Sequence, residues 1–399
     1  MSNVRKYRRL LWVLLGCSLL LCAVYSYYMV KNSIPDEISV YEGQEAQLNE
    51  ALPSSVLTYD DDIAVLGSNQ YQLKCRLFGM LPVKTVKVQS IPRQSVFVSG
   101  QTIGIYMETE GVMIIDAGEI EAADEMHTKP AEHIVKPGDY ILAVNGSEIQ
   151  NKKELMKLVD QSAGEEMELV LKRGLEKITV ALTPVMTKDG SYKLGIWVRD
   201  NIQGIGTLTF MKPDGTYGAL GHGISDIDTG ELLSLSQGEL YSAKILSVSK
   251  GVSGNPGELK GVITYQDEEK LGSITVNQYN GISGRLNEKG EQQLTGRQME
   301  LGLKQEVAEG PAEIWCNVDG EVKKYQVEIT EINYGDENSN KNFVIHVTDQ
   351  RLLGSTGGIV QGMSGSPVIQ NDKLVGAVTH VFVQDATRGY GIFVENMIQ

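Results

Sequence analysis

Residues 357–381 read GGIVQGMSGSPVIQNDKLVGAVTHV, and the rest of the chain is best understood outward from this stretch. Its centre, Gly362-Met363-Ser364-Gly365-Ser366-Pro367, has the form G-x-S-G-x-P. The glycines let the backbone turn tightly without a Cβ clash, which presents the Ser364 hydroxyl and lets neighbouring N–H groups converge on one point. The apolar runs on either side of Asn371-Asp372 predict a β-hairpin directly after this turn. Because Ser366 replaces the second glycine of G-x-S-x-G, an α/β-hydrolase is disfavoured.

For catalysis, a serine at such a turn needs a general base. If the chain supplies no base, the simpler interpretation is that this stretch is only a glycine turn between two strands. The chain has five histidines. His222 lies between two glycines at the end of an apolar stretch, which leaves its imidazole approachable. His346 and His380 lie inside β-like apolar runs, where a hydrogen-bonded structural histidine is expected. His222 is therefore the predicted base.

Length and composition favour β-rich domains with more than one hydrophobic core. The chain has 399 residues, of which 41% are apolar and 43 are glycine, and runs rich in valine, isoleucine and threonine recur. The net charge of −15 argues against nucleic-acid binding. The four cysteines have no zinc spacing and no disulfide framework, although a single Cys75–Cys316 link stays open. The chain lacks H-E-x-x-H, C-x-x-C and Walker motifs, so no metal and no cofactor is predicted.

The N-terminus has the pattern of a membrane anchor. A basic segment, residues 1–9, precedes residues 10–30, which carry no charge and could span roughly 30 Å as a helix. The excess of basic residues before this run predicts a cytoplasmic N-terminus and an ectodomain on the other side. A cleaved signal peptide is the rival interpretation, but no clear A-x-A site follows. Residues 31–95, with an acidic and polar composition, are predicted to form a stalk or linker.

Residues 96–185 have the pattern of a PDZ domain. The apolar-Gly-apolar run Ile103-Gly104-Ile105 is predicted to be the loop whose N–H groups bind a peptide carboxylate. A strand then leads into the turn Asn145-Gly146, and a helix follows that is capped by Asn151. Alternating strands are expected at 167–172 and 177–182. A small α+β domain without a ligand is the alternative.

Residues 186–399 show repeated short strands and glycine turns, typical of a sandwich or barrel. The order His…Asp…Ser with the hairpin after the serine resembles the chymotrypsin-like double β-barrel. Three motifs resemble the stage IV sporulation protein B family of membrane-anchored signalling serine peptidases: Leu220–Asp226 (LGHGISD), Val347–Asp349 (VTD) and Thr356–Pro367 (TGGIVQGMSGSP).

The resemblance implies the catalytic triad His222, Asp349 and Ser364, with an oxyanion hole made by the N–H groups of Gly362 and Ser364. Asp349 precedes the serine by far fewer residues than the acid does in most chymotrypsin-like chains. Asp226 and Asp228, just after the histidine, therefore stay open as alternatives.

The resemblance also implies a serine endopeptidase that signals between compartments during sporulation. Such a protein would be held in the forespore membrane by a single span, with its ectodomain between the forespore and mother-cell membranes. It would cleave itself and then a membrane-bound regulator, and so activate the processing of pro-sigma-K. Peptide termini at the PDZ groove are the other expected partners. A non-catalytic PDZ scaffold with a degenerate peptidase fold is the alternative from another class.

Overall fold

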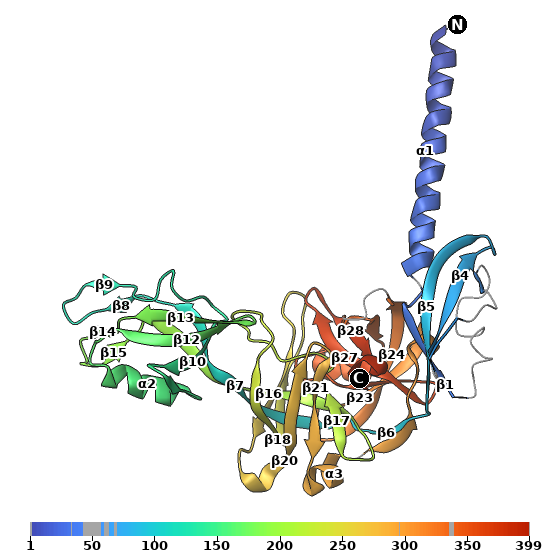
Figure 1. Ribbon diagram of the computed structural model, residues 1–399. Coiled ribbons are helices and arrows are strands. Elements are labelled where there is room, and N and C mark those ends of the chain that lie inside the picture. Colours follow the sequence, from blue (N-terminus) through green and yellow to red (C-terminus); the bar gives the residue numbers. More distant parts are fainter. Residues whose placement is uncertain are drawn as a thin grey trace.

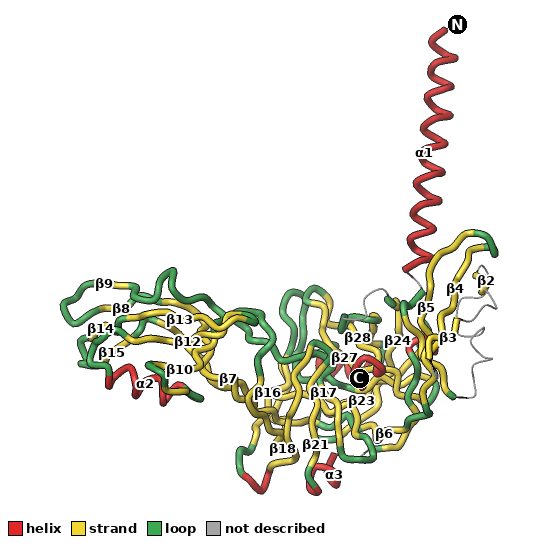
Figure 2. The backbone as a smooth tube through the Cα atoms, in the orientation of Figure 1, coloured by secondary structure: helices red, strands yellow, loops and turns green. Residues whose placement is uncertain are grey.

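The structure is a computed structural model that describes residues 2–32, 34–42, 57–59, 64–67, 70–294, 296–334 and 339–398. Most of the described chain is β-strand (Figure 2). One long helix stands away from the body with a small sheet at its foot, two barrels follow, and an α+β unit lies at the far end (Figure 1). The mostly β architecture that the sequence predicts is confirmed.

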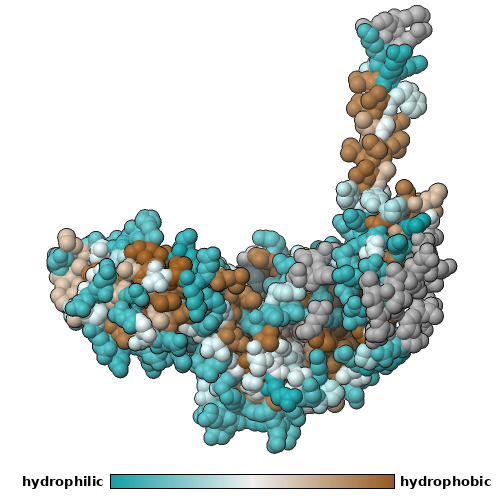
Figure 3. All heavy atoms as spheres, viewed as in Figure 1, coloured by the Kyte–Doolittle hydropathy of each residue, from teal (hydrophilic) through white to brown (hydrophobic). Residues whose placement is uncertain are grey.

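Helix α1 (Ser2–Asn32) has the properties expected of a membrane span. Its segment Lys6–Asn32 is long and apolar enough to cross a bilayer. Most of the side chains of this segment are exposed, and they form an apolar column on the surface (Figure 3). By length and composition the helix fits either a membrane anchor or a signal sequence.

The range predicted as a stalk contains a folded sheet. Its strands run in the order β1-β5-β4-β2, with β3 paired to β4. Their bounds are β1 Glu37–Tyr41, β2 Leu57–Tyr59, β3 Ala64–Gly67, β4 Gln70–Leu77 and β5 Leu81–Ile91. Apolar side chains on one face, including Ile38 and Val86, are fully buried because they pack against one another. A linker interpretation of all of 31–95 is therefore corrected; the acidic run at 60–62 lies outside the described residues.

The α+β unit is inserted into the first barrel. Strands β7 (Thr102–Ala117) and β16 (Ile196–Met211) pair with each other along most of their length, and their far ends pack in the core of this unit. Between them lie β8 Ile120–Glu121, β9 His127–Thr128, β10 Tyr140–Val144, β11 Ser147–Glu148, α2 Lys152–Gln161, β12 Met167–Arg173, β13 Glu176–Leu182, β14 Val185–Met186 and β15 Tyr192–Lys193. The predicted boundary at 185/186, between a PDZ domain and a peptidase domain that follow one another in the chain, is corrected. The chain enters the first barrel on β7, leaves it to form the α+β unit and returns to the barrel on β16.

Local signals in this unit fold as predicted. The Asn151 side chain accepts a hydrogen bond from the N–H of Glu154 and caps α2. Asn145 and Gly146 both have positive φ, which a two-residue hairpin turn needs.

The first barrel is closed by β7, β18, β20, β21, β17 and β16, since β16 pairs back to β7. The remaining bounds are β17 Thr216–Ala219, β18 Leu235–Ser249, β20 Lys270–Gln278 and β21 Gly281–Leu286. Its core contains Ile103, Ile105, Met107, Leu208 and Leu240, all buried. Accessory elements are β6 Ser95–Val98, β22 Arg297–Glu300, β19 Glu258–Ile263, α3 Glu288–Leu294 and the 3₁₀ turns Asp267–Glu269 and Lys304–Glu306.

The second barrel is closed in the order β23-β24-β25-β28-β27-β26. Its strands are β23 Gly310–Asn317, β24 Val322–Ile332, β25 Phe343–Val347, β26 Pro367–Gln370, β27 Lys373–Phe382 and β28 Asp385–Phe393, with helices α4 Gln350–Thr356 and α5 Val394–Ile398. The hairpin β26–β27 turns at Asn371 and Asp372, both with positive φ, as the sequence predicts. Cys316 is buried in this core and Cys75 in the N-terminal sheet, and both are free thiols, so they form no disulfide link.

Candidate active site

The turn that carries Ser364 packs closely against the first barrel at its second glycine. A Cβ at Gly365 would lie 2.1 Å from the carbonyl oxygen of Thr207 and 2.5 Å from the nitrogen of Leu220, and the residue has φ +93°. Only glycine fits this close approach. The carbonyl of Ser364 accepts a hydrogen bond from the N–H of Thr207 at 3.0 Å. Ser364 therefore lies on the seam between the two barrels.

Two N–H groups of this turn are left without a protein acceptor. The turn itself is closed by the N–H of Met363, which donates to Val360 O at 3.1 Å, and by the N–H of Ser366, which donates to Met363 O at 2.9 Å. Within the described residues, the N–H groups of Gly362 and Ser364 donate to no protein acceptor. Unpaired N–H groups beside a serine hydroxyl can hold the negative charge of a tetrahedral intermediate.

His222 follows β17 in a loop that packs against β27. A Cβ at Gly221 would lie 3.0 Å from the Thr379 side chain, which shows how closely the loop approaches that strand. The Nδ1 atom of His222 lies 2.8 Å from the carbonyl oxygen of Gly223. A carbonyl only accepts hydrogen bonds, so Nδ1 carries the proton and Nε2 keeps its lone pair. This is the tautomer that a general base needs.

The serine hydroxyl itself has a different partner in this structure. Ser364 Oγ donates to the carbonyl oxygen of Thr379 at 2.7 Å, and it makes no hydrogen bond with His222. Thr379 precedes His380, whose ring lies 4.8 Å from the ring of His222, centroid to centroid. The serine, the histidine and His380 thus meet at one seam, but the proton-transfer contact is not formed.

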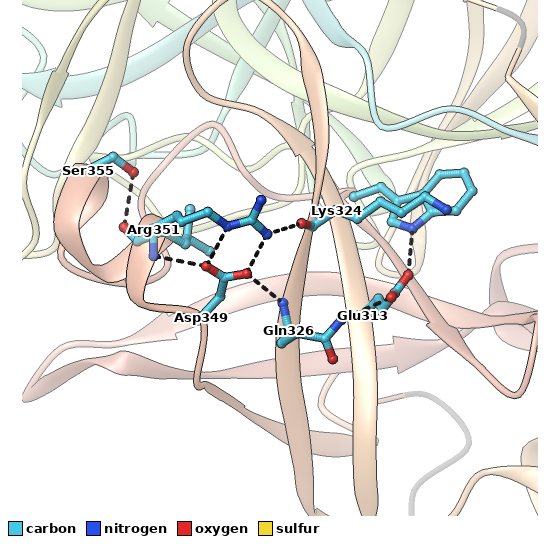
Figure 4. A network of polar contacts seen from close by, with 8 residues as sticks. Glu313, Lys324, Gln326, Asp349, Arg351 and Ser355 are labelled. Carbon is cyan, nitrogen blue, oxygen red and sulfur yellow. Dashed lines mark hydrogen bonds and ion pairs between the residues drawn. The ribbon is translucent and has the colours of Figure 1, made fainter.

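Asp349 is held by other groups (Figure 4). Its carboxylate accepts hydrogen bonds from the backbone N–H of Arg351 at 2.9 Å, from the Arg351 guanidinium at 2.7 and 3.1 Å, and from the N–H of Gln326 at 3.2 Å. These bonds, led by that of the guanidinium, lower the pKa of Asp349 to about 2. Asp349 caps helix α4, which leads into the segment that carries Ser364. The structure therefore does not bring Asp349 to His222.

The alternative acids have structural partners too. Asp226 is buried, pairs with Arg199 and accepts the N–H groups of Asp228 and Thr229. Asp228 pairs with the same Arg199 at 3.0 Å. Neither carboxylate is hydrogen-bonded to His222, so the Gly223 carbonyl is the group that orients the imidazole here.

This arrangement predicts that the acid limb of the pH–activity profile has its midpoint at an unusually low pH. Burial lowers the pKa of His222, and among the described residues no carboxylate is hydrogen-bonded to the ring to raise it. Activity needs the neutral imidazole, so it is lost only as the pH falls through this lowered pKa. We expect the acid limb of kcat/KM to have its midpoint below about 6.5, the ordinary histidine value. A midpoint above that value would show that a carboxylate pairs with His222 in the active enzyme.

The prediction that Ile103, Gly104 and Ile105 form a PDZ peptide loop is wrong. These residues lie in β7 of the first barrel, where Ile103 and Ile105 are buried in the core. A Cβ at Gly104 would lie 2.6 Å from the Ile263 side chain, so the glycine lets β19 pack on the barrel. The apolar-Gly-apolar pattern occurs both in a loop that binds a peptide carboxylate and in a strand that another strand crosses closely. Only the three-dimensional packing distinguishes these two kinds of structure.

The sequence also did not predict a clamp on the segment that carries Ser364. The β18–β19 hairpin reaches the second barrel, where the N–H of Leu259 donates to Gln361 O at 2.9 Å and the N–H of Gln361 donates to Gly257 O at 2.8 Å. Leu259 also fills the space above Gly362, and its side chain is part of the second barrel's core. These backbone bonds have no side-chain pattern that a sequence could reveal.

Gly104→Leu tests whether Gly104 is needed for β19 to pack on the first barrel. We expect the leucine to push Ile263 aside, to destabilise the fold by about 1–3 kcal/mol, and to loosen the clamp, because β19 continues into it. Hydrolysis of a small ester and cleavage of a protein substrate should then fall together with the melting temperature. Gly204→Ala is the matched control, since a Cβ at Gly204 meets no atom within 4 Å. If Gly104→Leu lost only protein cleavage, at an unchanged melting temperature, the peptide-loop interpretation would return.

His380 was expected to be a hydrogen-bonded structural residue, and that expectation is wrong for one of its nitrogens. Its Nδ1 atom is buried and has no hydrogen-bond partner among the described residues. Burial, with the neighbouring His222, lowers the pKa of His380 to about 4, so it is neutral at neutral pH. A buried nitrogen that lacks a partner among the described residues and lies beside His222 is a feature that strand periodicity could not reveal.

Comparison with known proteins agrees with this organisation. Residues 190–398, just over half of the chain, match the family model of the SpoIVB peptidase S55, and residues 129–173 match that of the PDZ domain. The α+β unit is thus a PDZ domain, as the sequence predicts. The comparison with curated protein sequences found no match.

Similar solved structures cover single parts of the chain. The PDZ domain of the SdrC-like protein from Listeria monocytogenes is 18% identical and the match covers 22% of this chain and 87% of that one, with a TM-score of 0.19. The Rv3671c protease in its inactive form is 13% identical, with 49% of this chain and 81% of that one covered and a TM-score of 0.28. The active form of the Rv3671c protease from M. tuberculosis is 14% identical, with 49% of this chain and 72% of that one covered and a TM-score of 0.23.

Proposed function

The chain belongs to the SpoIVB peptidase S55 family, and from that membership we propose that this serine peptidase is a sporulation signal that acts across a membrane-bounded space. The proposed cleavage targets are the chain itself and then a membrane-bound regulator, whose cleavage activates pro-sigma-K processing. Helix α1 is the proposed single-span anchor in the forespore membrane, with the ectodomain facing the mother-cell membrane. The PDZ domain supports a role in binding peptide termini.

The proposed chemistry is acyl transfer at Ser364. The hydroxyl leaves Thr379 O by rotation about its Cα–Cβ bond, and Oγ attacks the peptide carbonyl while its proton passes to Nε2 of His222. The N–H groups of Gly362 and Ser364 receive the oxyanion. Collapse of the intermediate breaks the C–N bond, and the leaving amine takes the proton from His222. Water then attacks the acyl carbonyl while Nε2 of His222 takes a proton from it. The C–O bond to Ser364 breaks, Oγ takes this proton back from His222, and the carboxylic acid product is released.

One observation carries this proposal. The Nδ1 proton of the His222 imidazole is donated to Gly223 O, beside a serine turn whose N–H groups at 362 and 364 have no acceptor among the described residues. Asp349 is proposed as a positioning residue, because it fixes the start of the helix that leads into the turn. By this proposal it acts on catalysis only through the placement of Ser364.

Labelling with a fluorophosphonate probe tests the function. The purified full-length chain should react at Ser364, and Ser364→Ala should not react although it stays folded. Shorter forms of the wild-type chain that are missing in Ser364→Ala would establish self-cleavage. A folded wild-type chain that neither reacts nor cleaves itself would favour the non-catalytic PDZ scaffold, which is the alternative that the unformed Ser364–His222 contact allows. In a spore-forming host, Ser364→Ala should block pro-sigma-K processing.

A further inference from the structure

The turn between β4 and β5 exposes large apolar side chains in an unusual place. Phe78 is 67% exposed, Met80 77% and Leu81 58%. Phe78 and Gly79 both have positive φ, so the turn is tight and its side chains project outward. A hairpin tip in water is normally polar, whereas a contiguous group of exposed apolar side chains marks a site of contact with a protein or a membrane.

The end of helix α1 is fixed to this hairpin. The hydroxyl of Tyr27 donates to the carbonyl oxygen of Pro82 at 3.3 Å, directly after the tip. Tyr27 and Val30 also pack against the core of the sheet, and Lys84 donates to Ile34 O at 2.6 Å just beyond the helix. The hairpin rises beside the foot of α1 in Figure 1, and apolar surface lies at that foot in Figure 3. The C-terminal end of α1 and the tip of the hairpin therefore lie at the same height along the axis of the helix.

That level is the boundary of the membrane if α1 spans it. The uncharged run of α1 ends at Val30, and Tyr27 lies three residues before this end, about 4.5 Å deeper at 1.5 Å per residue. Pro82, which Tyr27 contacts, therefore lies at the edge of the hydrocarbon layer, and the tip lies next to it in sequence. Apolar and aromatic side chains at this depth partition into the interface.

We infer that the β4–β5 tip, Phe78 to Leu81, inserts into the interfacial layer of the same phospholipid bilayer that α1 spans. The inference rests on the proposed anchoring by α1. A second contact beside the helix would fix the orientation of the N-terminal sheet against the membrane. This sheet is tied to the peptidase by Tyr41, whose hydroxyl donates to Leu301 O at 2.6 Å, so the active site would be held at a set height.

Quenching of tryptophan emission by brominated lipids tests the inference. The full-length chain would be reconstituted into phosphatidylcholine–phosphatidylglycerol vesicles whose lipids carry bromine near the glycerol end of the acyl chains. Native Trp12 in α1 reports the anchor, and its share of the emission is isolated with Trp12→Phe. Phe78→Trp and, separately, Met80→Trp report the tip. Leu175→Trp is the matched control, because Leu175 is fully exposed at the β12–β13 turn of the distant PDZ domain.

The expected result is that the indole introduced at position 78 or 80 loses emission to an extent comparable with Trp12, while the one at position 175 keeps it. Quenching of Trp12 without quenching at 78 and 80 overturns the inference and leaves the anchor intact. Absence of quenching at all sites overturns both the anchor and the tip. Blue-shifted, unquenched emission at position 78 that depends on protein concentration would assign the tip to a contact between copies of the chain instead.

Discussion

Ser364→Ala is expected to abolish peptide hydrolysis, with kcat falling by about 10⁴- to 10⁶-fold, as happens when the nucleophile of a serine peptidase is removed. The fold should be unchanged, because the substitution deletes one hydroxyl whose partner, Thr379 O, lies at the seam between the barrels. The measurement compares kcat/KM for a fluorogenic peptide with the melting temperature of the same preparation. Residual activity should come from the unpaired N–H groups and from binding alone.

Ser366→Ala is the matched control for this result. Ser366 is fully buried, and its hydroxyl donates to Met363 O at 2.6 Å. That carbonyl also accepts the N–H of Ser366 itself, so it keeps a partner after the substitution. We expect a loss of about 1 kcal/mol of stability and nearly normal activity. An inactive but folded Ser366→Ala together with an active Ser364→Ala would exchange the roles of the two serines.

Turns and helix caps, which depend on only a few adjacent residues, could be predicted from the sequence. The Asn371-Asp372 turn, the Asn151 cap and the Asn145-Gly146 turn fold as predicted, because each depends on the conformational preferences and hydrogen bonds of adjacent residues. The G-x-S-G-x-P turn belongs to the same group. Its glycines have the positive φ values that the motif requires.

Contacts between residues that lie far apart in the sequence could not be predicted from it. Strand β7 belongs to the first barrel although a whole PDZ domain follows it, so a boundary drawn along the sequence divides the barrel wrongly. Asp349 lies near Ser364 in sequence, but its carboxylate is bound by the Arg351 guanidinium and the Gln326 N–H and makes no hydrogen bond with His222. The Gly223 carbonyl that orients the imidazole is a backbone group, which residue identity cannot reveal.

His222→Ala should be as damaging as loss of the nucleophile, with kcat lowered by about 10⁶-fold, because the serine proton then has no acceptor. The side chain donates to Gly223 O and contacts His380, so its removal leaves a small cavity at the seam and a limited loss of melting temperature. The measurement is the pH dependence of kcat on a fluorogenic peptide. Loss of the acid limb in the residual activity identifies His222 as the group that titrates.

Asp349→Asn decides whether the imidazole is oriented by a carboxylate or by the Gly223 carbonyl. Loss of a triad carboxylate costs about 10⁴-fold in kcat, because the histidine then adopts the wrong tautomer. In this structure the Nδ1 proton is already held by Gly223 O, and asparagine can still cap α4. We therefore expect kcat to stay within about tenfold of wild type at temperatures where the variant is folded, with a lower melting temperature because Arg351 loses its charged partner. A 10⁴-fold loss in a fully folded Asp349→Asn would mean that Asp349 leaves Arg351 and reaches His222 when substrate binds.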